Sequence, residues 1–353
     1  MNEKFRLNRF KDFLFFRVRE TMRLPPHLPE TFAMRYPRGY FSFNLLVFLV
    51  VLVSSGCSQG PDEVVVDFNR TKSAQSAHAI TQGSRSLKVA AGAMVSPRET
   101  LIYYGQLLDY LGRKLGLEVE LIQRKTYSEI NDMLAKGQID LAFICSGPYA
   151  AGRDKFGFEL VAAPQVQGRK FYHSYLIVNR DRPFERIEDL RGKLFAFTDP
   201  DSNTGRLVPT YWLAQIGEKP ETFFKKTIYT HSHDNSILAV AKGLVDGAAV
   251  DGLVWEYYHE KNPTQTSLTR IIRKSDPYGN PPVVASRYVS SDLKESIGRV
   301  LFSMHLDPAC EKILQSLMID RFLEPREEWY DGIRSIHLAL ASVERRPRDS
   351  QEP

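Results

Sequence analysis

A seven-residue motif that occurs twice constrains the fold more than any other feature of the sequence. It reads KGQIDLA at 136–142 and KGLVDGA at 242–248. Each copy closes a segment whose apolar residues have helical spacing and leads into a short apolar segment. This pattern indicates a helix that ends at the glycine and a strand that follows. The segments upstream of each copy alternate strand and helix in the same order, so the sequence predicts two similar α/β lobes.

The expected elements give each lobe a parallel sheet with helices on its faces. In the first unit we expect strands at 87–93, 117–123 and 139–145 and helices at 99–115 and 128–137. In the second unit we expect a short helix and a strand within 186–198, strands at 226–232 and 247–251, and a helix from residue 234 that ends at Gly243.

Two lobes of this kind leave a ligand cleft between them, faced by the loops that follow the carboxyl ends of the parallel strands. We expect lobe 1 to comprise residues 87–178 and 277–340, and lobe 2 to comprise residues 179–276. Residues 341–353 are predicted to be a disordered tail, because their composition is polar and charged.

The segment 1–56 is predicted to be a secretory leader. Basic residues precede an apolar run at 41–53, which is shorter than the roughly 20 residues that a spanning helix needs. Small residues and Cys57 follow, as in a bacterial lipobox, so Cys57 is the expected lipidation site, although Ser54 stands where that motif has leucine. An uncleaved N-terminal anchor is the alternative.

The leader is long, and Met22 and Met34 are alternatives to Met1 as the start of translation. Residues 57–86 are rich in Ser, Gln, Ala, Thr and Gly, which predicts a flexible tether. With or without cleavage, the domain is expected on the periplasmic or cell-surface side, attached to a bacterial membrane.

Charge argues against a nucleic-acid-binding protein. Nine of the 47 basic and four of the 42 acidic residues lie in 1–56, so 38 of each sign remain after the leader. Cys145 and Cys310 lie in apolar surroundings and are expected to be buried free thiols, with a disulfide between them as the alternative. No cysteine pair has metal-site spacing, so no metal site is expected.

Polar residues follow the carboxyl ends of six predicted strands, and the densest group is DPDSNTG at 199–205, where a helix begins. Helix capping explains any one of these loops, but not why donors recur at one edge of successive strands. A helix start rich in hydroxyl, amide and glycine N–H groups suits a tetrahedral oxyanion such as phosphate, phosphite or a phosphonate. Asp251 and Asp276 would accept a hydrogen bond from a P–OH group or an amine of the ligand.

Four motifs in order resemble those of the solute-binding proteins of phosphate, phosphite and phosphonate ABC transporters. They are DLAFICSGPYA, TDPDSNTGRLVP, HSHDNSILAVAKGLVDGAAVD and KSDPYGNPPVV, and the resemblance runs from about residue 87 to 340. The resemblance implies the type II periplasmic-binding-protein fold: two α/β lobes with a ligand cleft, joined by two hinge crossovers. It also implies an extracytoplasmic lipoprotein that captures a phosphorus oxyanion by lobe closure.

The resemblance further implies the residues of the site and the partners. Ser202, Asn203 and Thr204 would hold the oxyanion. The pocket would be completed by His233, Asp251, Tyr149, Tyr103, Asp276 and Ser146. The expected partners are the ABC permease and ATPase subunits and the membrane through the lipid anchor; the protein is expected to be a monomer without a cofactor.

Other function classes fit the residues less well. A hydrolase would need a nucleophile elbow, and no G-x-S-x-G sequence is present. A zinc site at His231 and His233 is disfavoured, because other histidines of the domain that could join them, such as His173 and His259, lie elsewhere in the sequence. A ligand-sensing lipoprotein of the same fold, which signals to a membrane partner instead of feeding a transporter, is the alternative that we keep.

Overall fold

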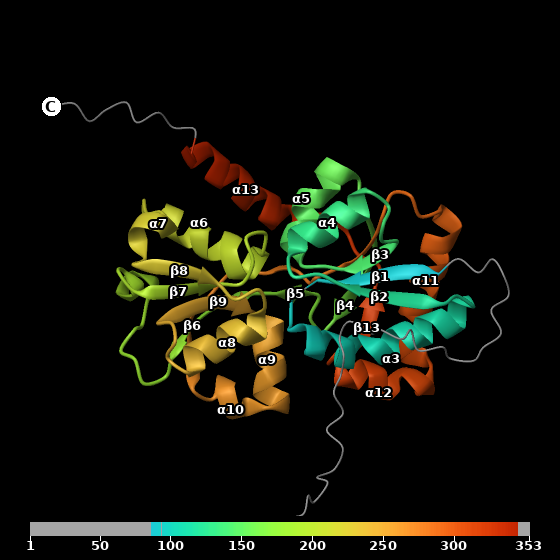
Figure 1. The fold of residues 1–353 in the computed structure, drawn as a ribbon, viewed down its shortest axis with the longest axis horizontal. Helices are drawn as coiled ribbons and strands as arrows, with labels where there is room; N and C mark the ends of the chain where they lie inside the picture. The colour runs from blue at the N-terminus through green and yellow to red at the C-terminus, as the bar shows by residue number, and fades with distance from the viewer. Residues whose placement is uncertain (1–85, 93, 345–353) are drawn as a thin grey trace, which may run out of the picture. The chain divides into compact units, whose positions relative to one another are not determined.

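The computed structural model describes residues 86–344, without Ala93 and without the side chains of Glu99, Tyr103 and Glu344. The expected leader, the lipidation site Cys57, the tether up to residue 85 and residues 345–353 of the expected tail lie outside the described residues. Within the described range the chain forms two α/β lobes, each built around one mixed sheet (Figure 1). The prediction of two α/β lobes is confirmed.

Lobe 1 is a six-stranded sheet with helices packed against it. Its elements are β1 (Leu87–Ala91), α3 (Pro97–Leu115), β2 (Val119–Gln123), α4 (Tyr127–Ala135), β3 (Leu141–Phe143), α5 (Ser146–Phe156), β4 (Glu159–Gln165), β12 (Val283–Ala285), α11 (Ser291–Ser303), η3 (Met304–Leu306), η4 (Pro308–Cys310), α12 (Glu311–Ser316) and β13 (Arg321–Leu323). The strand order is β13-β4-β12-β3-β1-β2.

Lobe 2 is a five-stranded sheet. Its elements are β6 (Ser174–Asn179), η1 (Ile187–Leu190), β7 (Leu194–Phe197), η2 (Asn203–Leu207), α6 (Val208–Gln215), α7 (Pro220–Phe223), β8 (Lys226–Tyr229), α8 (His233–Ala241), β9 (Gly247–Asp251), α9 (Gly252–Lys261), α10 (Pro263–Thr266) and β10 (Thr269–Lys274). The strand order is β10-β6-β9-β7-β8.

The sheets are mixed rather than fully parallel as predicted. The strands of the repeated units are parallel, whereas β12 is antiparallel to β3 and β6 is antiparallel to β9. The reason is that the chain passes between lobes at the carboxyl edge of the parallel strands. A strand that enters a sheet from that edge must run in the opposite direction.

Two segments connect the lobes. They pair with each other as a short antiparallel ribbon, β5 (Phe171–Tyr172) with β11 (Tyr278–Gly279). The predicted boundary of lobe 1 at residue 178 is too late, because β6 starts at Ser174 and pairs with β9 and β10 in the sheet of lobe 2. The apolar strand SYLIVN gives no sequence signal of which of two similar sheets it joins.

The repeated motif has the same structural role in both lobes. Gly137 and Gly243 each end a helix in the left-handed conformation, with φ of 66° in both. Three residues after each glycine, an aspartate side chain accepts a hydrogen bond from the first parallel strand of its lobe. Asp140 Oδ2 accepts from Lys88 N–H, and Asp246 Oδ2 accepts from Leu194 N–H, each at 2.9 Å. The sequence repeat therefore reflects one αβ unit used twice.

The C-terminal segment contacts both lobes. After η5 (Glu327–Tyr330), helix α13 (Asp331–Glu344) packs against α5 of lobe 1 and α6 of lobe 2. Residues 341–344, expected in the disordered tail, continue this helix, because Leu340 still packs on the core.

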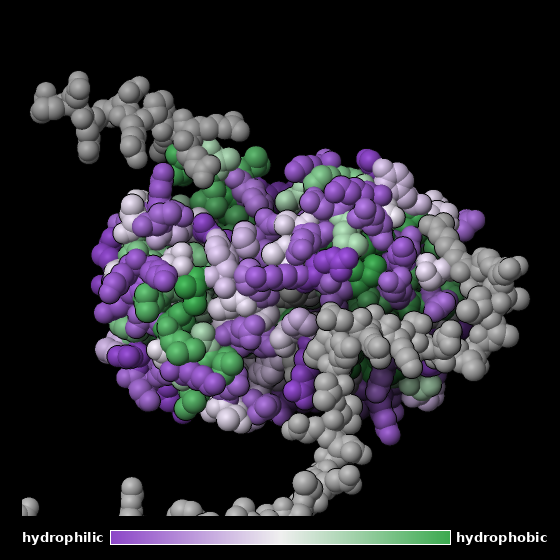
Figure 2. Space-filling model, viewed as in Figure 1, coloured by the Kyte–Doolittle hydropathy of each residue, from purple (hydrophilic) through white to green (hydrophobic). Residues whose placement is uncertain are grey.

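The surface is mostly hydrophilic on the face seen in Figure 2, with hydrophobic residues showing over lobe 2 and beside α13. Cys145 and Cys310 are buried free thiols, as predicted. Among the helices of the described residues, none combines the length and the apolar composition that a membrane crossing requires.

Candidate functional site

The stretch after β7 forms a π-helical turn, η2. Ser202 precedes it, and the Ser202 side chain accepts from Gly205 N–H at 3.0 Å, so Ser202 caps the turn. Its carbonyl accepts from Leu207 N–H at 2.9 Å, five residues on. Ser202, Asn203 and Thr204 are fully buried. π-helical turns of this kind are found frequently at functional sites.

Glycines allow the close approach of backbone around this turn. A Cβ atom on Gly205 would lie 2.3 Å from Thr198 Oγ1. A Cβ atom on Gly147, at the start of α5, would lie 2.7 Å from Asp201 O and 2.8 Å from Asn203 N. The helix start of lobe 1 therefore packs directly on the turn of lobe 2.

A buried polar cluster joins both lobes and a crossover. Ser146 Oγ of lobe 1 lies 2.5 Å from the hydroxyl of Tyr172, in the first crossover. The Asn203 amide of lobe 2 donates to Tyr172 Oη at 3.2 Å, and its Nδ2 is 3.5 Å from Ser146 Oγ. The predicted site residues Ser146 and Asn203 are thus brought together, with Tyr172 between them.

His233, the first residue of α8, is buried and neutral. Its Nδ1 accepts from the backbone N–H of Asp251 at 3.0 Å and lies 3.2 Å from Thr198 Oγ1. Burial lowers the pKa of His233 to about 3. Because Nδ1 is an acceptor, the single ring proton lies on Nε2, which has no hydrogen-bond partner among the described residues.

Asp251 ends β9 and caps α9. Its Oδ1 accepts from the backbone N–H groups of Leu253 and Val254 at 2.7 and 3.4 Å. Burial raises the pKa of Asp251 to about 7. Across the sheet from Asp251 lies Ser174, whose hydroxyl donates to the carbonyl of Thr204 at 2.7 Å, so Asp251 and the turn are close.

Several buried polar atoms near Asp251 lack a partner among the described residues. The donors among them are the Tyr127 hydroxyl, Thr204 Oγ1, Ser232 Oγ and His233 Nε2, and Asn203 Oδ1 of the same turn is an unpartnered acceptor. Tyr127 begins α4 of lobe 1, and burial raises its pKa well above the ordinary value, with Cys145, Asp199 and Asp251 nearby adding to the effect. A buried donor without a partner is costly. A group of them from both lobes indicates a place where a ligand with several acceptor atoms binds.

Two residues of the predicted site, Tyr149 and Asp276, lie elsewhere. The Tyr149 hydroxyl donates to Glu327 Oε1 at 2.7 Å and its ring packs on Tyr330, so it belongs to the core. Asp276 is exposed. The side chain of Tyr103 lies outside the described residues, whereas that of its neighbour Tyr104 is placed near Asp251 and has its pKa raised to about 12, first by burial and then by that carboxyl group.

Tyr127, Tyr172 and Tyr104 were not identified from the sequence. Tyr127 follows the carboxyl end of β2. It would have been identified if the loop after β2 had been counted among the loops that follow predicted strands. Tyr172 and Tyr104 carry no such signal, because one lies in a crossover ribbon and the other on a helix face.

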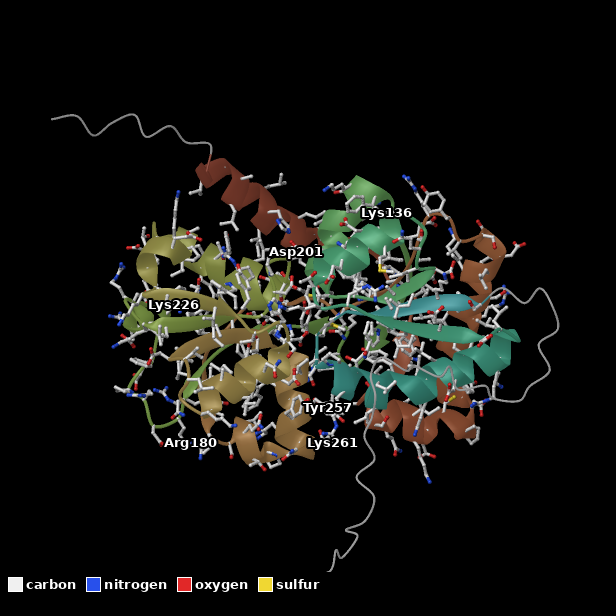
Figure 3. All side chains as sticks on the ribbon, in the orientation of Figure 1. Lys136, Arg180, Asp201, Lys226, Tyr257 and Lys261 are labelled. Atoms are coloured by element: carbon white, nitrogen blue, oxygen red, sulfur yellow. The ribbon has the colours of Figure 1, made fainter. Side chains whose placement is uncertain are left out.

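The two lobes are in contact across the cleft. His233 N–H donates to Met94 O at 3.0 Å, and Ser96 N–H donates to Asp234 Oδ1 at 3.1 Å. Figure 3 places Asp201 and Tyr257 where the lobes meet. Tyr127 N–H also donates to Asp199 Oδ2 at 3.2 Å, so donors of lobe 1 engage the turn region of lobe 2.

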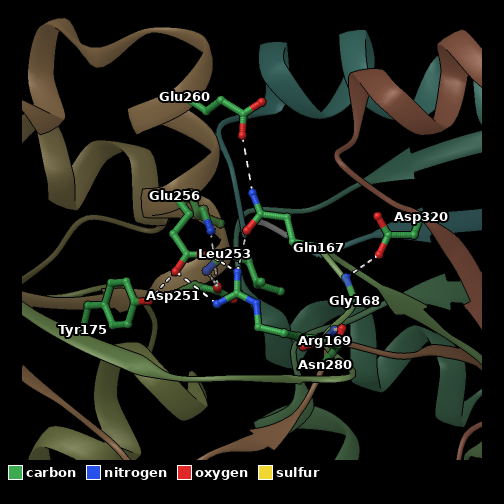
Figure 4. Close-up of polar contacts among 11 residues, drawn as sticks. Gln167, Gly168, Arg169, Tyr175, Asp251, Leu253, Glu256, Glu260, Asn280 and Asp320 are labelled. Carbon is green, nitrogen blue, oxygen red and sulfur yellow. Dashed lines mark hydrogen bonds and ion pairs between the residues drawn. The ribbon is translucent and has the colours of Figure 1, made fainter.

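An ion pair near the crossover adds to these contacts (Figure 4). Arg169 Nη2 lies 2.5 Å from Glu256 Oε2 on α9 of lobe 2, and the Tyr175 hydroxyl also contacts Glu256. The turn that carries Arg169 is held to lobe 1, because Gly168 N–H donates to Asp320 Oδ2 at 2.6 Å. We call the pair Arg169–Glu256 the interlobe ion pair.

Comparison with known proteins gives a consistent result. A family model described as "ABC transporter, phosphonate, periplasmic substrate-binding protein" matches residues 90–330. The chain is 30% identical over 186 residues to the phosphate-import protein PhnD of Mycolicibacterium smegmatis, covering 49% of this chain and 57% of that protein. It is 28% identical over 245 residues to the probable ABC transporter phosphite binding protein PhnD1 of Prochlorococcus marinus, covering 66% of this chain and 82% of that protein.

A third relative is the phosphonates-binding periplasmic protein of Escherichia coli, 26% identical over 215 residues, covering 60% of this chain and 63% of that protein. The matched region thus spans less than two thirds of the first and third of these relatives.

Solved structures establish the fold. A binding protein component of an ABC phosphonate transporter from Pseudomonas aeruginosa has a TM-score of 0.70 at 22% identity, covering 74% of this chain and 88% of that one. PhnD1 from Prochlorococcus marinus in complex with methylphosphonate has a TM-score of 0.66 at 23% identity, covering 72% and 98%. The fold is therefore that of the periplasmic binding proteins, as the resemblance implied.

Proposed function

We propose that this chain, which belongs to the family of periplasmic substrate-binding proteins of phosphonate ABC transporters, captures a phosphorus oxyanion between its lobes. The ligand would be a phosphonate, phosphite or phosphate. The observation that carries the proposal is the set of buried, unpartnered donors around Asp251, contributed by both lobes. Relatives whose names specify phosphite, phosphonates or phosphate import support the same ligand class.

The donors fit a tetrahedral oxyanion. Thr204 Oγ1 and the Tyr127 hydroxyl each can donate one hydrogen bond, and the neutral His233 donates through Nε2. Hydrogen bonds to an ion are stronger than those between neutral groups, and burial strengthens them further. Asp251, with its pKa near 7, would donate to an anion oxygen when protonated and accept from a P–OH group when ionised.

Binding and closure would be coupled. Tyr127 belongs to lobe 1, whereas Thr204 and His233 belong to lobe 2, so the full donor set exists only when the lobes are together. A ligand that binds the closed form better shifts the population toward it. The closed form would then dock on an ABC permease with its ATPase.

The protein would act outside the cytoplasm as a monomer held to the membrane by a lipid on Cys57. It would release its ligand chemically unchanged, because the site needs no nucleophile to hold an anion.

The experiment is calorimetric titration with phosphate, phosphite and methylphosphonate. Thr204→Val removes one donor and keeps the side-chain shape, so affinity should fall roughly tenfold to a hundredfold, as expected for a lost hydrogen bond to a charged group. Thr227→Val, on the edge strand β8, is the matched control and should bind like the parent. Equal affinity in both variants, or no binding of any of the three anions, would refute the proposal.

A growth test separates transport from sensing. Cells that lack the gene should fail to use the bound anion as their only phosphorus source. Normal uptake without the protein would instead favour the sensor.

A further inference from the structure

A cavity of about 130 Å³ lies beside Asp251, at the junction of the two lobes and the crossovers. We call it the apolar cavity. Lobe 2 contributes the start of α9, and lobe 1 contributes the loop after β1, the face of α3 and the segment between α12 and β13. Among the lining residues are Met94, Tyr104, Phe143, Val254, Ile319 and Phe322.

The lining is suited to a group without charge. Of the described residues that line the cavity, Asp251 alone carries a carboxyl group, and none is Lys, Arg or His. Oδ1 of that carboxyl group already accepts from the Leu253 and Val254 amides. The next acidic residue on α9, Glu256, is engaged by Arg169 and Tyr175.

The cavity borders the proposed anion site through Asp251 and Met94. Asp251 lines the cavity and donates its backbone N–H to His233. Met94 also lines it, accepts from His233 N–H, and packs against Tyr127. A molecule whose anionic head meets His233 and Tyr127 would therefore direct its other end past Asp251 into the cavity.

We propose that the apolar cavity receives the uncharged organic substituent of a phosphonate, so the preferred ligand is an alkyl- or arylphosphonate. This inference rests on the proposed function and narrows its ligand class. The size is appropriate, because an apolar cavity of roughly 150 Å³ in another protein admits benzene. Inorganic phosphate and phosphite have no group that would fill it.

An aminoalkyl substituent fits less well. Placing an ammonium group in apolar surroundings is costly unless it is paired and hydrogen-bonded. Among the described lining residues Asp251 carries the one carboxyl group that could pair with the ammonium, and one of its oxygens is committed to the start of α9. Propylphosphonate and 2-aminoethylphosphonate have nearly the same shape, so they separate charge from size.

The first experiment is calorimetry of the full chain with methyl-, propyl-, phenyl- and 2-aminoethylphosphonate. Each methylene buried should tighten binding about fourfold, so propylphosphonate should bind roughly fifteenfold tighter than methylphosphonate. 2-Aminoethylphosphonate should bind more weakly than propylphosphonate. The inference is overturned if chain length has no effect or if the amine binds more tightly. If none of phosphate, phosphite and methylphosphonate binds, the proposed function fails as well.

The second experiment fills the cavity. Ile319→Trp should remove most of the gain of propyl- over methylphosphonate and leave methylphosphonate binding near that of the parent. Leu306→Trp, on an exposed side chain (74% accessible) outside the cavity, is the matched control. Methylphosphonate binding reports on folding; if Ile319→Trp loses it, Val254→Phe fills the same cavity from lobe 2 and decides. A full propyl preference in a folded cavity-filling variant overturns the inference.

Discussion

Asp251→Asn should stabilise the folded protein at neutral and higher pH. The stabilisation should be much smaller in acid. Asp251 is 1% exposed, and burial raises its pKa from 3.8 to about 7. Asparagine has the same shape and can still accept from the Leu253 and Val254 amides through its Oδ1 atom. The substitution therefore keeps the cap of α9 and removes only the ionisation.

The direction and the size of this pH dependence follow from proton linkage. Between about pH 4 and pH 7 the folded state holds one proton more than the unfolded state at this carboxyl group, so the free energy of unfolding falls as pH rises. The contribution of this carboxyl group to stability is fully present below its pKa in the unfolded state, 3.8. It is lost as the pH rises through its pKa in the folded state, about 7. The whole shift corresponds to about 4 kcal/mol, of which roughly 3 kcal/mol falls between pH 5 and pH 8.

The assay is urea unfolding of parent and variant at pH 5, 6, 7 and 8, in buffers free of phosphorus because a bound anion would stabilise the folded state. The difference in unfolding free energy, variant minus parent, should rise by roughly 3 kcal/mol across this range and level off near pH 7. Other titrating groups occur in both proteins and cancel. Asp276→Asn, at an exposed position, controls for the amide itself. A difference that stays constant with pH, or that falls, would refute a protonated Asp251.

Further variants test the donors, the turn and the closure. Tyr127→Phe should weaken methylphosphonate binding roughly tenfold in calorimetry, because it removes a buried donor to an ion; unchanged affinity would remove Tyr127 from the site. Gly205→Ala should lower the free energy of unfolding in urea by about 1–3 kcal/mol, because its Cβ would lie 2.3 Å from Thr198 Oγ1; parent-like stability would contradict that packing. Arg169→Met should weaken binding by a factor of about two to five by removing the partly exposed interlobe ion pair, and Glu256→Gln should do the same; parent-like affinity in both would mean that the pair does not favour closure.

The sequence predicted the parts of the fold that depend on local pattern. The repeated motif predicted two αβ units because each copy carries a helix-ending glycine and a strand-bracing aspartate within a few residues. The polar residues that follow predicted strands, together with the family resemblance, predicted Ser202, Asn203, Thr204, His233 and Asp251, which the structure brings close together in one buried region. Each of these features depends on residues that are close together in the sequence.

Features that depend on distant partners were not predictable in this way. Tyr149 follows a parallel strand as the site residues do, but its hydroxyl is taken by Glu327, 178 residues later in the sequence. The first lobe boundary failed for a related reason, because β6 has the apolar pattern of a central strand and either sheet could have accepted it. Burial patterns indicate that a residue is inside, and they do not specify which neighbour it meets.

The distribution of donors between lobes explains why the two αβ units, though built alike, contribute differently to the site. Lobe 2 supplies the π-helical turn, which the bond from Gly205 N–H to the Ser202 side chain holds, and His233, whose imidazole is oriented by the Asp251 N–H group. Lobe 1 supplies Tyr127 and most of the wall of the apolar cavity. An anionic head held by lobe 2 would thus present its substituent to lobe 1. Closure of the lobes would then depend on both ends of the ligand: the charge selects what enters, and the apolar group determines how favourably the lobes close.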